Sequence, residues 1–147
     1  MLFEGIVNIN ASRDKVWAFL TDPDFVSQCA PGLKSMEVVE PDKKFKAVAA
    51  VGFGTVKVTF TNEVEFLELE KPNRAKVKAH GTAPGSAVDA VSEMILSDAV
   101  AGTTDLKWTA DITVVGTIAS LASRLMSGVT KKLTGEFFEC VRSRIEG

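Results

Sequence analysis

The stretch VWAFLTDPDFVSQCAPGLKSMEV, residues 16–38, changes its expected secondary structure twice within a few residues. Its first part has the apolar spacing of a helix. Asp22 and Pro23 then favour a second start, with Asp as the N-cap and Pro at the first helical position. Pro31 and Gly32 end that helix after barely two turns. The stretch therefore predicts two short helices followed by a strand.

The sequence on both sides of this stretch has the period of β-strands. Residues 2–10 alternate between apolar and polar side chains, and the same period of two runs from residue 33 to residue 116. Glycine, proline and asparagine mark the connections, which are short, so successive strands are predicted to be antiparallel. One face of the sheet is apolar and the other polar. We expect strands at about residues 2–10, 33–40, 44–52, 55–69, 74–82, 87–97 and 103–115.

Residues 117–145 change to the spacing of a helix, with apolar side chains at steps of three and four. Such a helix would be roughly 40 Å long, enough to lie across the whole sheet. Since the apolar face of the sheet must be covered, the long helix is expected to cover it. The sequence predicts one α+β domain over residues 1–147. In it a curved seven-stranded antiparallel sheet surrounds a long C-terminal helix, with two short helices between strands 1 and 2.

Two glycines and two cysteines leave alternatives open. Gly128 and Gly135 in the long helix mark a close approach to the sheet or a bend, or else they lie on its exposed side. Cys29 and Cys140 are far apart in the sequence and have no metal-site spacing. One disulfide is an option, but we expect two buried free thiols of a cytoplasmic protein. Cys29 just before the Pro31 turn is expected to be a packing residue rather than a nucleophile.

The composition excludes several classes of protein. With 46% hydrophobic residues, 24% charged residues and a net charge of −2, the 147-residue chain is an ordinary globular sequence. It lacks the basic excess of a nucleic-acid-binding protein, and no apolar run reaches the roughly 18 residues of a membrane span. We therefore expect a cytoplasmic protein.

The residue types that carry catalysis or bind metals are scarce. His80 is the only histidine, and its strand parity places it with Lys76 and Lys78 on the polar face. No cluster of histidine, cysteine and carboxylate side chains has the spacing of metal ligands. We find no nucleophile elbow and no phosphate-binding loop. The sequence predicts no catalytic residue, no metal and no cofactor.

The apolar face is lined by many small side chains, which favour either close packing or an open cavity. Methionines and aromatic residues among the small ones would form an adaptable apolar lining if a cavity is present. The predicted lining residues are Phe45, Ala47, Ala49, Phe60, Asn62, Val64, Val77, Ala79, Met94, Trp108, Ala110, Leu121, Leu125, Met126 and Val129.

Asn62 interrupts the apolar row of its strand. A buried amide needs hydrogen-bond partners, because an unpaired one costs about 1–3 kcal/mol. Asn62 could orient the carbonyl of a ligand, or it could bond a neighbouring main-chain group or mark a bulge. Ser92 is a similar but weaker case, since a serine can satisfy its hydrogen bonds locally.

Phe53 and the basic residues of the long helix are candidate contact points on the surface. Phe53 at a hairpin tip could touch a ligand, a membrane or a partner, but packing over the end of the long helix is slightly preferred. Arg124, Lys131 and Lys132 give part of the helix a weak basic bias, for which a solvated face is the preferred interpretation.

Several motifs occur in an order that is typical of one protein family. They begin with Gly5, Val16-Trp17, Asp22-Pro23 and Cys29-Ala30-Pro31-Gly32, and continue with Gly52, Gly54 and Phe60. The last ones are Gly102-Thr103-Thr104 with Leu106 and Trp108, then Gly116 with Ile118-Ala119, Leu121-Ala122 and Arg124-Leu125, and Phe137-Phe138. In this order, over essentially the whole chain, the sequence resembles the CoxG family, named for the G subunit of carbon monoxide dehydrogenase, within the START/Bet v 1-like (SRPBCC) helix-grip superfamily.

The resemblance implies a non-catalytic accessory protein that binds an apolar small molecule between sheet and helix. It implies a quinone or lipid as ligand, and service as carrier or membrane adaptor to a molybdenum hydroxylase of the carbon monoxide dehydrogenase type. Many family members continue into a membrane-associating tail, whereas this sequence ends at Gly147, so only transient membrane contact is expected. The alternatives are an enzyme of the cyclase or hydrolase type on the same fold, and an assembly factor with a filled core.

Overall fold

A seven-stranded sheet and one long helix dominate the structure, a computed structural model that describes residues 1–41 and 43–146. The strands are β1 (Leu2–Ile9), β2 (Leu33–Glu40), β3 (Lys44–Phe53), β4 (Val56–Glu70), β5 (Arg74–Ala83), β6 (Ser86–Asp98) and β7 (Thr104–Gly116). The helices are α1 (Arg13–Thr21), α2 (Pro23–Val26) and α3 (Ala119–Ile145), with short 3₁₀ turns η1 (Ser27–Cys29) and η2 (Val100–Gly102). The predicted order of elements is confirmed, and the strand limits agree to within about a residue.

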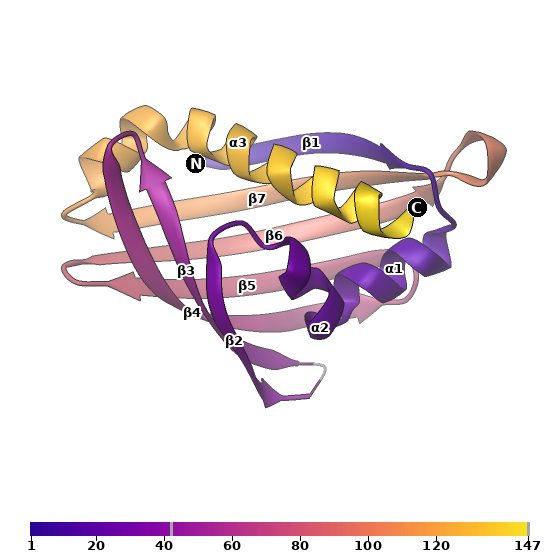
Figure 1. Ribbon diagram of the computed structural model, residues 1–147, viewed down its shortest axis with the longest axis horizontal. Coiled ribbons are helices and arrows are strands. Elements are labelled where there is room, and N and C mark those ends of the chain that lie inside the picture. The colour runs from indigo at the N-terminus through magenta and orange to yellow at the C-terminus, as the bar shows by residue number, and fades with distance from the viewer. Residues whose placement is uncertain (42, 147) are drawn as a thin grey trace.

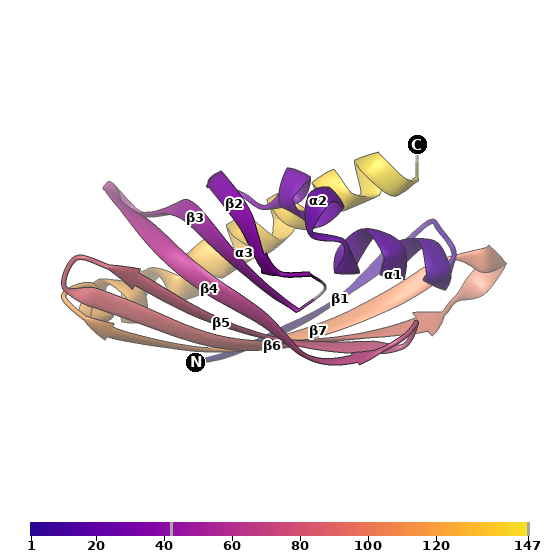
Figure 2. The same ribbon diagram turned by 90° about the horizontal axis from the view of Figure 1, so that it is seen from below.

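The sheet is antiparallel throughout, in the order β1-β7-β6-β5-β4-β3-β2. Only β1 leaves the sequential meander, because it pairs with β7 at the far end of the chain. Irregular register in β2 and at Phe66–Glu68 of β4 accompanies the strong bend of the sheet. Figures 1 and 2 show α3 lying across the concave side of the sheet, with α1 and α2 beside its C-terminal end. This is the predicted helix-grip arrangement.

Local capping explains where the two short helices begin. The Ser12 hydroxyl accepts a hydrogen bond from the main-chain N–H of Lys15 at 3.3 Å, which caps α1. The Asp22 carboxylate accepts from the N–H of Asp24 at 2.9 Å, and Pro23 follows at the first helical position of α2. After one turn α2 tightens into η1. With these caps, three short elements follow one another between residues 13 and 29, and the chain changes direction between them.

The buried core is divided into two clusters, one at each end of α3. The cluster at the C-terminal end contains Val141 and Ile145 of the helix, packed against Trp17 of α1 and Leu106 of β7. The cluster at the N-terminal end joins Ala122 and Met126 of the helix to Phe53, Phe60 and Ile118. The two clusters hold the ends of the helix against the sheet, while its middle spans the space between them.

The predicted faces of the strands are observed. Phe60, Leu96 and Leu106 are buried beneath α3, whereas the His80 side chain is 45% exposed and bonds Asp89 on the convex face. Phe53 is only 3% exposed, so it packs under the N-terminal end of α3 and is not a surface contact. Arg124 and its basic neighbours on α3 are exposed.

The glycines of α3 lie on its exposed side. A β-carbon added to Gly128 or Gly135 would meet nothing within 4 Å, so neither marks a close approach of helix and sheet.

Among the described residues no helix combines the length and the hydropathy that crossing a bilayer requires.

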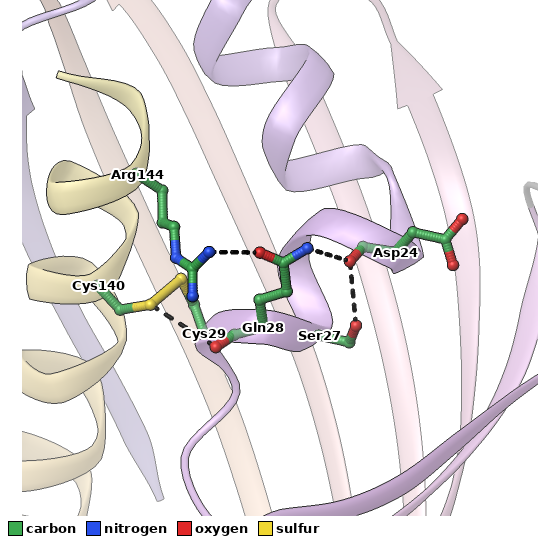
Figure 3. Close-up of a disulfide and its surroundings, with 6 residues drawn as sticks. All are labelled: Asp24, Ser27, Gln28, Cys29, Cys140 and Arg144. Atoms are coloured by element: carbon green, nitrogen blue, oxygen red, sulfur yellow. Dashed lines mark hydrogen bonds between the residues drawn. A yellow bond between two sulfur atoms is a disulfide. The ribbon is translucent and has the colours of Figure 1, made fainter. Parts of the chain in front are cut away.

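The expectation of two free thiols is wrong, because Cys29 and Cys140 form a disulfide. Their Cα atoms are 5.4 Å apart although 111 positions separate them in the sequence. Packing of η1 against α3 brings them together, and sequence spacing contains no record of that contact. Figure 3 shows a polar bridge beside the disulfide, in which Arg144 donates to the Gln28 side chain at 2.8 Å. The disulfide ties η1, which directly follows the two short helices, to the long helix α3.

Candidate functional site

A cavity of about 490 Å³ lies between the sheet and the middle of α3. Its walls come from the inner face of β3, β4, β6 and β7, from α3, and from α1, α2 and the turn before β2. The lining consists of Leu20, Val26, Pro31, Val51, Phe53, Phe60, Asn62, Val88, Ser92, Met94, Leu106, Trp108, Ala110, Ile112, Met126, Val129, Thr130, Leu133, Thr134, Phe137 and Phe138. Most of these side chains are apolar, as in a site for a hydrophobic molecule.

Small side chains in the sheet help to create the space. Ser92 and Ala110 are direct cross-strand partners on β6 and β7, and both point toward α3. Met94 and Trp108, the neighbouring pair, are large and form a wall beside them. Because α3 is held by a core cluster at each end, its middle does not sink into the gap that the small pair leaves.

The structure brings part of the predicted lining together at this cavity. The predicted residues that line it are Phe60, Asn62, Met94, Trp108, Ala110, Met126 and Val129. Phe45, Ala47 and Val64 instead line an adjoining hollow of about 300 Å³ below α2, which shares Val26, Pro31 and Phe137 with the cavity. Leu121 and Leu125 pack against the core cluster at the N-terminal end of α3. Ala49, Val77 and Ala79 are half-buried residues of the sheet outside the cavity wall. Contact of any of these residues with a ligand stays a prediction.

Several lining residues from the helices are not among those predicted from the sequence. Leu133 and Phe137 lie four and eight positions after Val129, so the apolar stripe on α3 already contained the signal for them. Leu20, Val26 and Pro31 close the end of the cavity through the folding of α1 and α2 onto the sheet. The sequence contains no local signal for that tertiary contact.

Asn62 is held in one orientation by the main chain. Its Nδ2 group donates to the carbonyl oxygens of Ala47 at 3.2 Å and Phe60 at 3.3 Å. Both amide hydrogens are therefore used, and Oδ1 is left as the free atom. Bonding to a neighbouring main-chain group was one of the predicted alternatives, beside a bulge and the orientation of a ligand carbonyl. Because the donor side is occupied, orientation of a ligand carbonyl does not fit this geometry.

Two further polar side chains of the lining also donate to main-chain carbonyls. The Ser92 hydroxyl donates to Thr109 O at 2.9 Å, and the Thr134 hydroxyl donates to Thr130 O at 2.8 Å. No lining residue of the cavity, all of them within the described chain, has a side chain that ionises near neutral pH. The cavity therefore offers hydrogen-bond acceptors in an otherwise apolar and uncharged wall.

Titratable groups gather on the convex face of the sheet instead. A charged hollow of about 400 Å³ there includes His80, Glu63 and Lys78, and His80 Nδ1 lies 2.6 Å from Asp89 Oδ1. The hollow has no serine, threonine or cysteine nucleophile among its lining residues. No group of three potential metal ligands occurs within residues 1–41 and 43–146.

Arg74 lies outside both the cavity and the charged hollow, at the start of β5. Hydrogen bonds to the carboxylates of Glu70, Glu68 and Glu93 raise the pKa of Arg74 above its ordinary value. The guanidinium therefore joins three neighbouring strands on the convex face as a permanent cation.

Solved structures share this fold over nearly the whole chain. A conserved protein from Geobacillus kaustophilus has 27% identity and a TM-score of 0.91, with 99% of this chain and 95% of that chain covered. The Zhui aromatase/cyclase from Streptomyces sp. R1128 has 18% identity and a TM-score of 0.76, with coverage of 99% and 93%. A START superfamily protein from Mycobacterium smegmatis has 12% identity and a TM-score of 0.64, with coverage of 99% and 97%.

These structures identify a START/Bet v 1-like fold, and the Streptomyces protein among them is an aromatase/cyclase. No curated protein sequence matches the chain. Residues 5–146 match the family model of the carbon monoxide dehydrogenase G subunit (CoxG), and the chain therefore belongs to the CoxG family.

Proposed function

We propose that this protein binds a quinone- or lipid-like apolar molecule in the cavity between the sheet and α3. The observation that carries the proposal is the cavity of about 490 Å³ with its almost wholly apolar wall. In a filled core, side chains would occupy this volume, since protein interiors contain few voids larger than a water molecule. The cavity therefore favours a binding role over an assembly factor with a solid core.

In this role the protein serves a molybdenum hydroxylase of the carbon monoxide dehydrogenase type, as carrier or membrane adaptor. Membership in the CoxG family supports this partner class. A carrier that collects its ligand at a membrane needs only transient contact with the bilayer. A cytoplasmic location at the inner membrane face fits that task, although the argument from free thiols no longer supports it.

A neutral fluorescent dye tests for the binding site. N-Phenyl-1-naphthylamine should gain fluorescence on addition of the protein and lose it on competition with a long-chain quinone. Ala110→Phe places a ring in the cavity and should abolish most of the dye signal. Thr113→Phe is the control, because it adds the same ring to the exposed face of the same strand.

Thermal unfolding of both variants shows whether each is folded. A folded Ala110→Phe protein that binds the dye as well as the wild type does would contradict the proposal. Co-purification with a molybdenum hydroxylase, compared between wild type and Ala110→Phe, then tests whether the partner recognises the loaded protein.

An enzyme of the cyclase type is the second candidate, and the similarity to the Streptomyces aromatase/cyclase favours it. The cavity would hold a flexible substrate in a compact conformation, and Asn62 and Ser92 would contact that substrate. However, acid–base catalysis needs a group that titrates near the working pH, and the cavity wall offers none. Turnover of an apolar polyketide-like substrate by the purified protein would favour the enzyme over the carrier.

A further inference from the structure

Three of the hydrogen-bonding side chains in the cavity wall share one property, which concerns the kind of ligand that they can recognise. Asn62, Ser92 and Thr134 each use their donor hydrogens on main-chain carbonyl oxygens of the protein. What each of them still offers is an oxygen lone pair. A ligand that enters the cavity therefore meets acceptors, and acceptors are satisfied by a donor on the ligand.

Asn62 provides the best-defined of these acceptors. Its Oδ1 forms no hydrogen bond with any described residue, and it is not sealed off, because no fully buried side-chain oxygen or nitrogen of those residues lacks a partner. The amide cannot simply turn over to present its N–H groups, because two carbonyl oxygens would then face Oδ1. The orientation of the carboxamide is thus determined by the hydrogen bonds of strands β3 and β4.

Gly81 on the neighbouring strand makes room for this orientation. It is the cross-strand partner of Asn62, and a β-carbon at position 81 would lie only 2.3 Å from Oδ1. Any larger residue there would push the carboxamide away. The absence of a side chain at position 81 and the two donated hydrogen bonds together keep Oδ1 in place.

Two other polar groups at the wall do not reverse this balance. The Thr130 hydroxyl can act as donor or as acceptor, so it has no preference. The indole Nε1–H of Trp108 forms no hydrogen bond with a described residue and is a donor, but it lies beside Gly5 of β1, where a β-carbon would be 2.7 Å from Nε1. Trp108 on β7 is three strands away from Asn62 on β4, so this donor is separate from the acceptor at Asn62. The remaining lining is apolar and uncharged, which disfavours a ligand with a carboxylate or an amine buried in the cavity.

We propose that the cavity selects a neutral apolar molecule with a hydroxyl group, a phenol or an alcohol, and that Asn62 Oδ1 accepts the hydrogen bond from that hydroxyl. The inference rests on the proposed function and narrows its ligand class. For a ligand that exists as a quinone and a quinol, the site prefers the quinol. The carbonyl oxygens of the quinone would face Asn62 Oδ1 without a hydrogen between them.

Three matched probes separate this inference from the proposed function. They are 2-hexylnaphthalene, 6-hexyl-2-naphthol and 6-hexyl-2-methoxynaphthalene, with affinities measured by displacement of N-phenyl-1-naphthylamine. The naphthol should bind about five- to tenfold more tightly than its methyl ether, the net effect of one hydrogen bond. The ether keeps the ring, the chain and the oxygen but has no donor.

Variants at two positions assign the preference to Asn62. Asn62→Leu should bring the ratio of naphthol to ether close to one, and thermal unfolding shows whether the variant is folded. Gly81→Ala should have the same effect, because it displaces the carboxamide without removing it. Asn10→Leu, at an exposed asparagine far from the cavity, should retain the full preference.

Each outcome has one meaning. Failure of wild-type protein to bind 2-hexylnaphthalene at all would overturn the proposed function itself. Binding of the hydrocarbon with equal affinities for naphthol and ether would overturn the inference and leave the proposed function standing. A preference that survives in both Asn62→Leu and Gly81→Ala would overturn the assignment to Asn62.

Discussion

Gly5 on β1 and Trp108 on β7 are cross-strand partners, and the indole ring lies over the glycine. A β-carbon at position 5 would be within 2.9 Å of three ring atoms. Gly5→Ala should therefore force the ring to move and destabilise the protein by about 1–3 kcal/mol, as overpacking does. Urea unfolding measures the loss, and a shift of the tryptophan emission maximum reports the displaced ring.

Gly52→Ala is the matched control for this change. Gly52 also lies in a strand, but a β-carbon there would meet nothing within 4 Å, so its unfolding midpoint should stay the same or rise slightly. Equal effects of the two substitutions would contradict the close contact of Gly5 with Trp108.

Asn62 illustrates how much can be predicted for a single side chain. The alternation of β4 correctly predicts that it faces α3, because side-chain direction follows from the period of two. Its hydrogen bonds are another matter. They depend on the carbonyl oxygens of Ala47 and Phe60, which are positioned by the strand register and by the bend of the sheet. A one-dimensional pattern cannot place those atoms, so the sequence left open whether Asn62 donates or accepts.

At the scale of elements, substitution of the two exposed glycines of α3 tests whether the helix needs them in order to bend. Gly128→Ala and Gly135→Ala should each stabilise the protein by about 0.5–1 kcal/mol, because alanine restricts the unfolded chain and clashes with nothing here. The midpoint of urea unfolding measures the gain. A loss of stability in either variant would mean that the helix needs the glycine for a bend.

Gly116→Ala at the end of β7 is the contrasting change. Gly116 has a φ of 97°, and a β-carbon there would lie 2.1 Å from the carbonyl oxygen of Gly85. The same substitution should therefore be strongly destabilising at this position. Opposite effects at these positions would show that the conformation and surroundings of each glycine decide its contribution to stability.

The elements themselves could largely be predicted from the sequence. Strand limits followed from alternation and from turn residues, and Ser12 and Asp22 marked the starts of α1 and α2 because capping is a local interaction. What escaped prediction is how α2 folds onto the sheet. Val26 and Pro31 line the cavity together with residues more than a hundred positions away, such as Phe137. Local patterns do not encode such long-range neighbours.

For the whole molecule, the Cys29–Cys140 disulfide should make a large contribution to stability. It closes a loop across 111 positions, and a cross-link over such a length restricts the unfolded chain strongly. The double variant Cys29→Ala/Cys140→Ala should lose about 2–5 kcal/mol of unfolding free energy. Urea unfolding of wild type with and without dithiothreitol should reproduce this difference.

The reductant experiment contains its own control. The double variant has no thiols, so dithiothreitol should leave its unfolding curve unchanged. An equal effect of reductant on both proteins, or no effect on the wild type, would contradict the contribution assigned to the bond.

The redox state of Cys29 and Cys140 also reports whether the protein resides in an oxidising or a reducing compartment. β1, α1 and α2 lie outside the covalent ring formed by residues 29–140, whereas the six strands β2 to β7 lie within it. Thiols trapped with an alkylating agent at the moment of cell lysis gain mass, whereas bonded sulfurs do not. One mass measurement on protein taken directly from cells therefore tells whether its compartment is reducing or oxidising. Two added alkyl groups indicate a reducing compartment, and none indicates an oxidising one.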